Sequence, residues 1–241
     1  MEMRKYSVSV AMAAYNGEKY IKEQIESILC QLEERDELVI SLDPSTDSTE
    51  SIISSFSDSR IHVVKGLGLG VKKNFENAFR HCSNDIIFLC DQDDIWMKDK
   101  IDKVVSSFSE DCYVVLHDCS VVDNDMNILD SSFFNLKNTD TGIFHNLVKN
   151  GYIGCCMAFR RELLDLILPI PEYIYMHDQF IGMAGELMGK NKLIHERLIY
   201  YRRHGDNVSD MQHGSISTMV RKRWNMVKAL LELKKRRKKL L

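Results

Sequence analysis

Short apolar runs alternate with amphipathic stretches through the first half of the chain. Five of the runs are bounded by polar or turn-forming residues and predict strands, at residues 6–14, 37–42, 61–64, 85–90 and 113–117. Four intervening segments repeat apolar positions every three or four residues and predict helices, at residues 18–32, 49–56, 71–81 and 99–108. This alternation predicts an α/β fold with a mostly parallel, doubly wound sheet that has helices on both faces.

The second half of the chain is less regular. Residues 123–127 have the composition of a hairpin turn. We expect strands at residues 151–159 and 192–202, and helices at residues 161–167, 180–188 and over the last 23 residues. No internal repeat is visible.

Composition fits a soluble globular protein, because 44% of the 241 residues are hydrophobic and 28% are charged. Seven cysteines without a CxxC pair predict buried free thiols in a reducing compartment. The N-terminus lacks the apolar core of a signal peptide, and no run approaches the about 20 apolar residues that span a bilayer. We therefore expect a cytoplasmic protein.

Carboxylates follow two of the predicted strands. Asp43 comes after the second strand, and Asp91, Asp93 and Asp94 come after the fourth. Parallel sheets bind ligands beyond the carboxyl ends of their strands, and acids packed this closely repel one another unless a cation such as Mg²⁺ or Mn²⁺ lies among them. Each acid also has a simpler explanation, an ordinary turn residue for Asp43 and a helix cap for Asp94. Their joint placement favours a nucleotide-diphosphate site with a metal.

The order of three segments makes the comparison with a known family specific. AAYNGEKYIKEQIESIL, SLDPSTDST and LCDQDDIW together resemble the nucleotide-binding domain of inverting family 2 glycosyltransferases with the GT-A fold. DQDDIW is similar to the DXD region of members that build bacterial surface polysaccharides, among them rhamnosyltransferase-like enzymes. The resemblance covers roughly residues 6–210. It implies an enzyme that moves a sugar from a UDP- or dTDP-sugar to a saccharide acceptor, with Mn²⁺ or Mg²⁺ as cofactor.

The resemblance also assigns residues to the donor. The residues that it implies contact the nucleotide sugar are Ala13, Tyr15, Asp43, Lys73, Asp91 and Gln92, with Asp91 near the ribose. It places Asp93 on the metal. Leu42 stands where the family usually has a first acid and Pro44 where it has a glycine, which leaves uridine and thymidine donors both open.

Two motifs in the second half resemble the parts of the family that act on the acceptor and the leaving group. His177-Asp178 resembles the family's ED or HD motif, whose Asp is the general base, although Asp178 also suits a helix N-cap. The segment 201–209 resembles a YRxHxxN segment, in which Arg203 would neutralise the diphosphate and His204 would approach the metal. A solvated loop is the alternative. Gly154 and the following cysteines fall on an acceptor-pocket strand or form a buried thiol pair.

Other functions fit the sequence less well. The GLGLG stretch at residues 66–70 follows the third strand, whereas a dinucleotide fold requires its GxGxxG after the first. A nucleotidyltransferase acting on sugar phosphates would need a glycine-rich, basic phosphate loop after the first strand, which AAYNGEKY does not supply. A non-catalytic nucleotide-sugar-binding module would not need Asp178.

The C-terminal tail is strongly basic. Residues 219–241 hold ten Lys/Arg and one acid, which leaves 22 basic and 34 acidic residues elsewhere, a net charge of −12. Apolar residues recur there at helical spacing, at Val220, Trp224, Val227, Leu230 and Leu231. A basic amphipathic helix is attracted to an anionic membrane surface; a solvated or partner-packed helix and a nucleic-acid contact are the alternatives. We expect a 1–210 glycosyltransferase domain, divided at residue 118 into nucleotide-sugar and acceptor halves, then a 211–241 tail that holds the protein peripherally at the inner membrane face beside a lipid-linked acceptor.

Overall fold

The computed structural model of the protein describes residues 4–204 and 216–240. The strands are β1 Val8–Ala14, β2 Glu37–Leu42, β3 Ile61–Lys65, β4 Ile86–Asp91, β5 Ile95–Trp96, β6 Cys112–Val122, β7 Ile128–Asp130, β8 Met157–Arg160 and β9 Lys190–Arg202. The helices are α1 Ile21–Leu29, α2 Thr49–Ser54, α3 Val71–His81, α4 Lys100–Ser106, α5 Phe133–Lys137, α6 Ile143–Val148, α7 Leu164–Ile167, α8 His177–Met188 and α9 Ile216–Leu240.

The described strands form one sheet in the order β3-β2-β1-β4-β8-β6-β9-β5, with β7 paired to β6. β1 to β4 are mutually parallel, and β6 is parallel to β9. β8 lies antiparallel between β4 and β6, so these two long strands point the same way. The predicted α/β class with a mostly parallel sheet is therefore confirmed, and the expected division at residue 118 falls inside β6.

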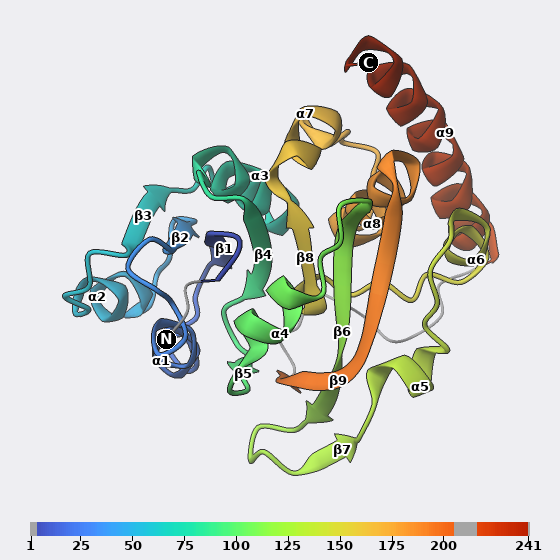
Figure 1. Ribbon diagram of the computed structural model, residues 1–241. Helices are drawn as coiled ribbons and strands as arrows, with labels where there is room; N and C mark the ends of the chain where they lie inside the picture. Colours follow the sequence, from blue (N-terminus) through green and yellow to red (C-terminus); the bar gives the residue numbers. More distant parts are fainter. Residues whose placement is uncertain (1–3, 205–215, 241) are drawn as a thin grey trace.

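Helices cover both faces of this sheet. α3 packs on β1 and β2, while α4 and α8 both pack on β6 and β9 from opposite faces (Figure 1). The core between these layers is apolar, and Trp96 belongs to it with 4% of its surface exposed and its ring 5.6 Å from that of Phe88. This tryptophan therefore packs in the core.

Sheet register sets the end of each strand. Ala13 in β1 lies opposite Ser41 in β2 and Asp91 in β4. The chain therefore leaves the sheet at one common edge, which we call the strand-end edge and define as the carboxyl ends of β1, β2 and β4. The nucleotide-side residues predicted from sequence lie along it.

Two predicted elements differ in the structure. The strand expected at residues 151–159 is only Met157–Arg160, because the chain before it makes a 3-10 turn at Gly154–Cys156. The strand expected to end at His117 continues to Val122, since Asp118 is satisfied inside the sheet by the backbone N–H groups of Cys119 and Phe134 and by the Ser132 hydroxyl. Local polarity was thus a poor guide to this strand end.

The tail helix α9 runs along the outside of the molecule, against α6, α7 and α8 (Figure 1). Four apolar residues on one of its faces are buried there, Met226, Ala229, Leu230 and Leu233. Across residues 4–204 and 216–240, we find no helix with the length and apolarity to cross a membrane.

Candidate active site

Asp91 is the last residue of β4 and lies at the strand-end edge. The five residues before it are fully buried, so the carboxylate appears where the chain leaves the core. Gln24 of α1 fixes this point by donating its amide to the Asp91 carbonyl at 3.0 Å and to the Cys90 sulfur at 2.9 Å. The position of the carboxylate is therefore set by sheet and helix packing.

Burial and neighbouring carboxylates raise the pKa of Asp91 and of Asp94. Desolvation raises the pKa of Asp91 to about 7, and the charges of Asp93 and Asp178 add to this effect. Burial also raises the pKa of Asp94 well above its usual range, with further contributions from Asp93 and Asp91. Such a cluster binds positive charge readily.

Asp94 does not cap the next helix, contrary to the expectation from sequence. It is 1% exposed, and its Oδ1 accepts a hydrogen bond from the Arg202 backbone N–H at 3.1 Å. α4 begins only at Lys100, with Asp99 at its N-cap position. The intervening β5 pairs with β9, and this long-range pairing carries the chain away from the helix start.

Asp93 and His204 meet at the more exposed side of the cluster. His204 Nε2 lies 2.8 Å from Asp93 Oδ2, and the His204 ring stacks on Tyr20 with centroids 4.9 Å apart. Carboxylate oxygen and imidazole nitrogen form a donor set that divalent transition metals accept. These two residues, beside the repelling acids, therefore fit a divalent cation.

A deeper group of possible ligands lies beneath this pair. Asp91, Asp94 and Cys155 each place a ligand atom within 4.8 Å of the others. Asp94 and Cys155 are each 1% exposed, and burial raises the pKa of the Cys155 thiol well above its usual range. A hard cation avoids a protonated thiol, and a diphosphate cannot reach a site buried this far. We therefore assign the candidate metal position to Asp93 and His204.

Asp178 faces the same cluster from the start of α8. It is 4% exposed, and its Oδ1 accepts a hydrogen bond from the Gln179 backbone N–H at 2.6 Å. Burial raises its pKa to about 6. The helix N-cap is Met176, so Asp178 lies in the first turn and is not the cap expected from sequence. Gly154 lies next to this acid, since a Cβ there would make ordinary van der Waals contact with the Asp178 Cβ at 3.7 Å.

The loop after β1 is hydrogen-bonded to Gln92 in the DQDD segment at the end of β4. Gln92 accepts a hydrogen bond from the Tyr15 backbone N–H and donates one to the Tyr15 carbonyl, both at 2.8 Å. A Cβ at Gly17 would lie 2.3 Å from Gln92 Oε1, so only glycine allows this approach. The Gln92 amide thus holds the loop, while Tyr15 itself is 55% exposed.

Asp43 is buried and holds the glycine-rich loop. Its Oδ1 accepts a hydrogen bond from the Gly68 backbone N–H at 2.9 Å. Gly66 packs directly on the Asp43 side chain, where a Cβ would lie 2.3 Å from that oxygen. These contacts hold the stretch at residues 66–70 against the Asp43 side chain at the end of β2.

The remaining predicted residues lie around this edge. Lys73 Nζ forms an ion pair with Glu76 Oε2 at 3.0 Å, and Asn74 in the same turn of α3 donates to the Ala14 carbonyl at 3.1 Å. Arg203 donates to the Tyr201 hydroxyl at 3.2 Å, immediately before His204. The rest of the 201–209 segment, residues 205–209, lies outside the described residues.

Two lysines at the site were not found by sequence reasoning. Lys100 is 1% exposed, and its ammonium donates to the Cys155 carbonyl at 3.0 Å and lies 3.8 Å from the Trp96 ring centroid. Its charge acts against the desolvation of Asp91 and lowers the pKa of that carboxyl. The only sequence signal was a lysine on the apolar face of a predicted helix, six residues after Asp94.

Lys72 is the second unforeseen lysine. Its Nζ donates to the carbonyls of Glu172 at 2.7 Å, Ile174 at 2.9 Å and Pro171 at 3.4 Å. It thereby ties α3 to the 169–176 loop, which leads directly into Asp178. No pattern in the local sequence marks such a contact, since its partners are backbone carbonyls a hundred residues away.

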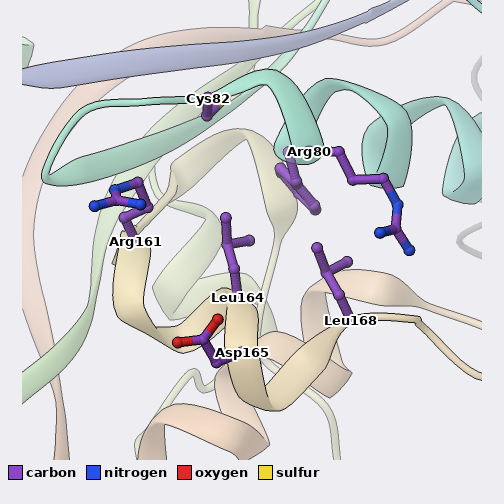
Figure 2. A pocket seen from close by; sticks show the side chains of 7 residues that line it. Arg80, Cys82, Arg161, Leu164, Asp165 and Leu168 are labelled. Carbon is purple, nitrogen blue, oxygen red and sulfur yellow. The ribbon is translucent and has the colours of Figure 1, made fainter.

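A separate cavity of about 490 Å³ lies between α3 and α7, lined among others by Arg80, Arg161 and Asp165 (Figure 2). Arg161 donates its backbone N–H to the Asp85 carbonyl at the start of β4. Asp91 ends the same strand, so this cavity lies at the opposite edge of the sheet from the acids. It is not part of the candidate site.

The fold and the acid cluster at the strand-end edge define a glycosyltransferase of the GT-A class. The sequence model of glycosyl transferase family 2 matches residues 9–168, and the chain belongs to this family. It is 30% identical over 183 residues to the Escherichia coli UDP-Glc:alpha-D-GlcNAc-diphosphoundecaprenol beta-1,3-glucosyltransferase WfgD, covering 76% of this chain and 70% of that one. The chain spans about two thirds of the length of such curated relatives.

Solved structures share the same fold. S. aureus TarS 1–349 in complex with UDP-GlcNAc superposes with a TM-score of 0.69 at 20% identity, over 94% of this chain and 66% of TarS 1–349. A mannosyltransferase from Pyrobaculum calidifontis in complex with GDP-Man and Mn²⁺ gives a TM-score of 0.65 at 17% identity, over 96% of this chain and 74% of the other. At this level of identity the likeness concerns the fold alone.

Proposed function

We propose that the protein transfers a sugar from a UDP- or dTDP-sugar to a saccharide hydroxyl, with inversion at the anomeric carbon. The observation that carries this proposal is the convergence of Asp178 from α8 with Asp91 and Asp93 from the end of β4. Family membership and the location of this cluster at the carboxyl ends of parallel strands support it.

Each part of the site has a role in this proposal. Asp43 and Ala13 receive the nucleoside, and Tyr15 and Lys73 border it. Asp91 contacts the ribose, while Gln92 holds the Tyr15 loop in place. Asp178 accepts the proton of the acceptor hydroxyl as its oxygen attacks the anomeric carbon. Arg203 lies at the side from which the diphosphate departs and stabilises its negative charge.

Asp93 and His204 are the residues that would hold the divalent cation, which we propose to be Mn²⁺ or Mg²⁺. When bound, such a cation neutralises the diphosphate leaving group. The fit of the carboxylate and imidazole pair supports the assignment, as does the Mn²⁺ bound to the Pyrobaculum mannosyltransferase of the same fold.

We propose a lipid-linked saccharide as the acceptor, within the synthesis of a bacterial surface polysaccharide. The name of WfgD specifies a diphosphoundecaprenol-linked acceptor and a UDP-Glc donor for that relative. An acceptor of this kind is anchored in a membrane, so the proposal places the protein at the cytoplasmic face of one.

The test is the Asp178→Asn variant, assayed with UDP- and dTDP-sugars, Mn²⁺ and a diphospholipid-linked saccharide. We expect the variant to lose about 10²- to 10⁴-fold in kcat, the usual contribution of a general base. Nucleotide affinity, measured by calorimetry with UDP and dTDP, should change little because in this proposal Asp178 contacts the acceptor hydroxyl and not the nucleotide.

The matched control is Asp165→Asn, which changes an acid at the opposite edge of the sheet and should leave kcat unaltered. Full activity in Asp178→Asn would show that another group removes the proton. Release of pyrophosphate, in place of a nucleoside diphosphate, would identify a nucleotidyltransferase. Nucleotide binding with no turnover of any donor would leave only a binding module.

A further inference from the structure

Helix α9 carries two apolar faces, of which the protein covers only one. The apolar positions predicted from sequence divide between them, because Leu230 is buried with Met226, Ala229 and Leu233. A second set stays exposed, with Val220 58%, Trp224 70%, Val227 37% and Leu231 57% exposed. These four residues are spaced by four, three and four positions, which places them on one side of a helix with 3.6 residues per turn. We call them the α9 stripe.

Exposed cations flank the α9 stripe. They are Arg221, Arg223, Lys228, Lys234, Lys235, Lys238 and Lys239. Helical spacing puts Arg221, Lys228 and Lys235 along one border of the stripe, and Arg223 and Lys234 along the other. An exposed apolar strip with cationic borders is the arrangement of a helix that lies in the plane of an anionic membrane surface.

Neighbouring elements extend this surface. Phe144 and Val148 are one turn apart on α6 and are 80% and 53% exposed. α6 packs against α9, and Arg223 donates to the Val148 carbonyl at 2.7 Å. On the other flank Tyr175 is 62% exposed and carries Lys222 Nζ 3.4 Å from its ring centroid. Large apolar side chains therefore gather where α9 meets both elements, which is uncommon for a surface that faces only water.

We propose that the α9 stripe, with Phe144, Val148 and Tyr175, docks the protein on an anionic lipid bilayer. Charge complementarity selects this occupant, since the tail holds ten basic residues and the rest of the chain has a net charge of −12. The acidic body repels a bulky polyanion, while a flat anionic surface can meet the tail alone. A nucleic acid would use the cations and leave Trp224 in water. Lipid uses both the cations and the apolar stripe.

The surface adjoins the 169–176 loop that leads into Asp178. Asn225 donates to the Tyr173 carbonyl at 3.0 Å, and the Tyr173 hydroxyl donates to Glu232 at 2.7 Å. Docking through α9 would therefore hold this loop beside the bilayer-bound helix. If the proposed function holds, a lipid-linked acceptor then approaches Asp178 from the membrane side; the docking itself is measured without any transferase activity.

Intrinsic fluorescence of the full chain gives a direct test, because the two tryptophans report different places. Trp96 is 4% exposed in the core, whereas Trp224 is 70% exposed on the stripe. Vesicles of phosphatidylcholine with phosphatidylglycerol should shift the emission to the blue, and brominated lipids should quench it. Pure phosphatidylcholine should produce a much smaller shift. Trp224→Phe should lose the shift and quenching but still float with the vesicles.

Vesicle flotation with paired variants completes the test. Val220→Ser/Val227→Ser should lower the partition coefficient by at least about tenfold, and each of Lys234→Gln and Lys235→Gln by roughly fivefold. Ile128→Ser/Leu129→Ser removes two apolar side chains of β7 that are more exposed than Val220 and Val227, and it should change nothing.

Three outcomes would overturn the docking proposal. The first is no binding to anionic vesicles at moderate salt. The second is tighter binding to duplex DNA that ignores the Val220/Val227 change. The third is a stripe-dependent dimer, seen by light scattering, that persists when vesicles are added. None of these outcomes would contradict the transferase proposal. Conversely, a protein that binds vesicles but has no transferase activity would contradict the transferase proposal and leave the docking proposal intact.

Discussion

The strand-end edge and the 169–176 loop hold two sides of one site by different means. At the strand-end edge, register aligns Ala13 with Asp91, and the buried strands set every position. The 169–176 loop buries Ile170 and Ile174, and it is also held by Lys72 of α3 and by Asn225 and Glu232 of α9. The first side is fixed by sheet register, while the second also needs polar side chains from two helices. We therefore expect substitutions at the strand-end edge to change donor affinity, and substitutions that loosen the 169–176 loop to change the KM for the acceptor.

After the loss of the proposed base in Asp178→Asn, the largest effect is expected at the metal position. Asp93→Asn removes a carboxylate charge beside His204, and kcat should fall about 10²- to 10³-fold, the scale for losing one charge-stabilising group. The Mn²⁺ concentration for half-maximal activity should rise in parallel. Asp99→Asn is the matched control, because Asp99 is exposed nearby in a left-handed conformation that Asn accepts. Equal Mn²⁺ dependence of Asp93→Asn and the unmodified protein would contradict the assignment.

The next largest effect is expected in the pH dependence of kcat/KM, which should differ from that of nucleotide affinity. Asp178 acts as a base only when ionised, and burial raises its pKa to about 6. We expect kcat/KM to be about tenfold lower at pH 5 than at pH 7. Nucleotide affinity at saturating Mn²⁺ gives the comparison, and it should vary less over the same interval because a bound cation favours the ionised form of Asp91. A flat kcat/KM profile between these values would argue against Asp178 as the base.

Ionisation of Asp178 should affect folding stability in the opposite direction to activity: it raises kcat/KM but lowers stability. The Asp178 pKa is higher in the folded protein than the about 3.9 of an unfolded Asp, so the folded state binds the proton more tightly. Its neutral form contributes stability below about pH 4, and this contribution is lost as pH rises through about 6. Asp178→Asn should therefore melt at a higher temperature than the unmodified protein at pH 8 but not at pH 4, by scanning calorimetry.

Two adjacent lysines of α3 sharpen the comparison. Lys72→Met removes three hydrogen bonds to the 169–176 loop, which should cost about 1–3 kcal/mol of stability and raise the acceptor KM roughly tenfold. Lys73→Met breaks only the pair with Glu76 and should act on donor affinity. Steady-state kinetics with each substrate varied in turn measures both. The same pattern in both variants would mean that α3 does not divide the two sides.

The smallest effect is expected at the β1 loop. In Gly17→Ala the new methyl group displaces the flexible Gln92 amide from Tyr15, so the loop loses about 1 kcal/mol of hydrogen bonding. The Kd for UDP should rise roughly fivefold with kcat nearly unchanged. Adding Gln92→Ala should have little further effect, because both changes break the same hydrogen bonds. If the losses of UDP affinity in the two single variants were fully additive, Gly17 would not act through the Gln92–Tyr15 hydrogen bonds.

Sequence patterns placed the strand-end acids because these residues directly follow local elements. Apolar runs fix β1, β2 and β4, and in a parallel sheet the residue after each run must emerge at the same edge. Asp43 and Asp91 could therefore be placed together without any contact information. Asp94 was misplaced for the complementary reason, since its partner Arg202 comes from a strand more than a hundred residues away.

The chain's own pattern of apolar and polar positions thus determined the α/β class, the strand-end acids and the amphipathic character of α9. Tertiary structure alone decided that Asp178 faces Asp91, that Lys72 holds the loop before it, and that Lys100 lies beneath the acids. It also decided which apolar face of α9 the protein buries and which stays exposed. The periodicity of a helix shows that a face is apolar, but what covers that face depends on contacts between distant segments.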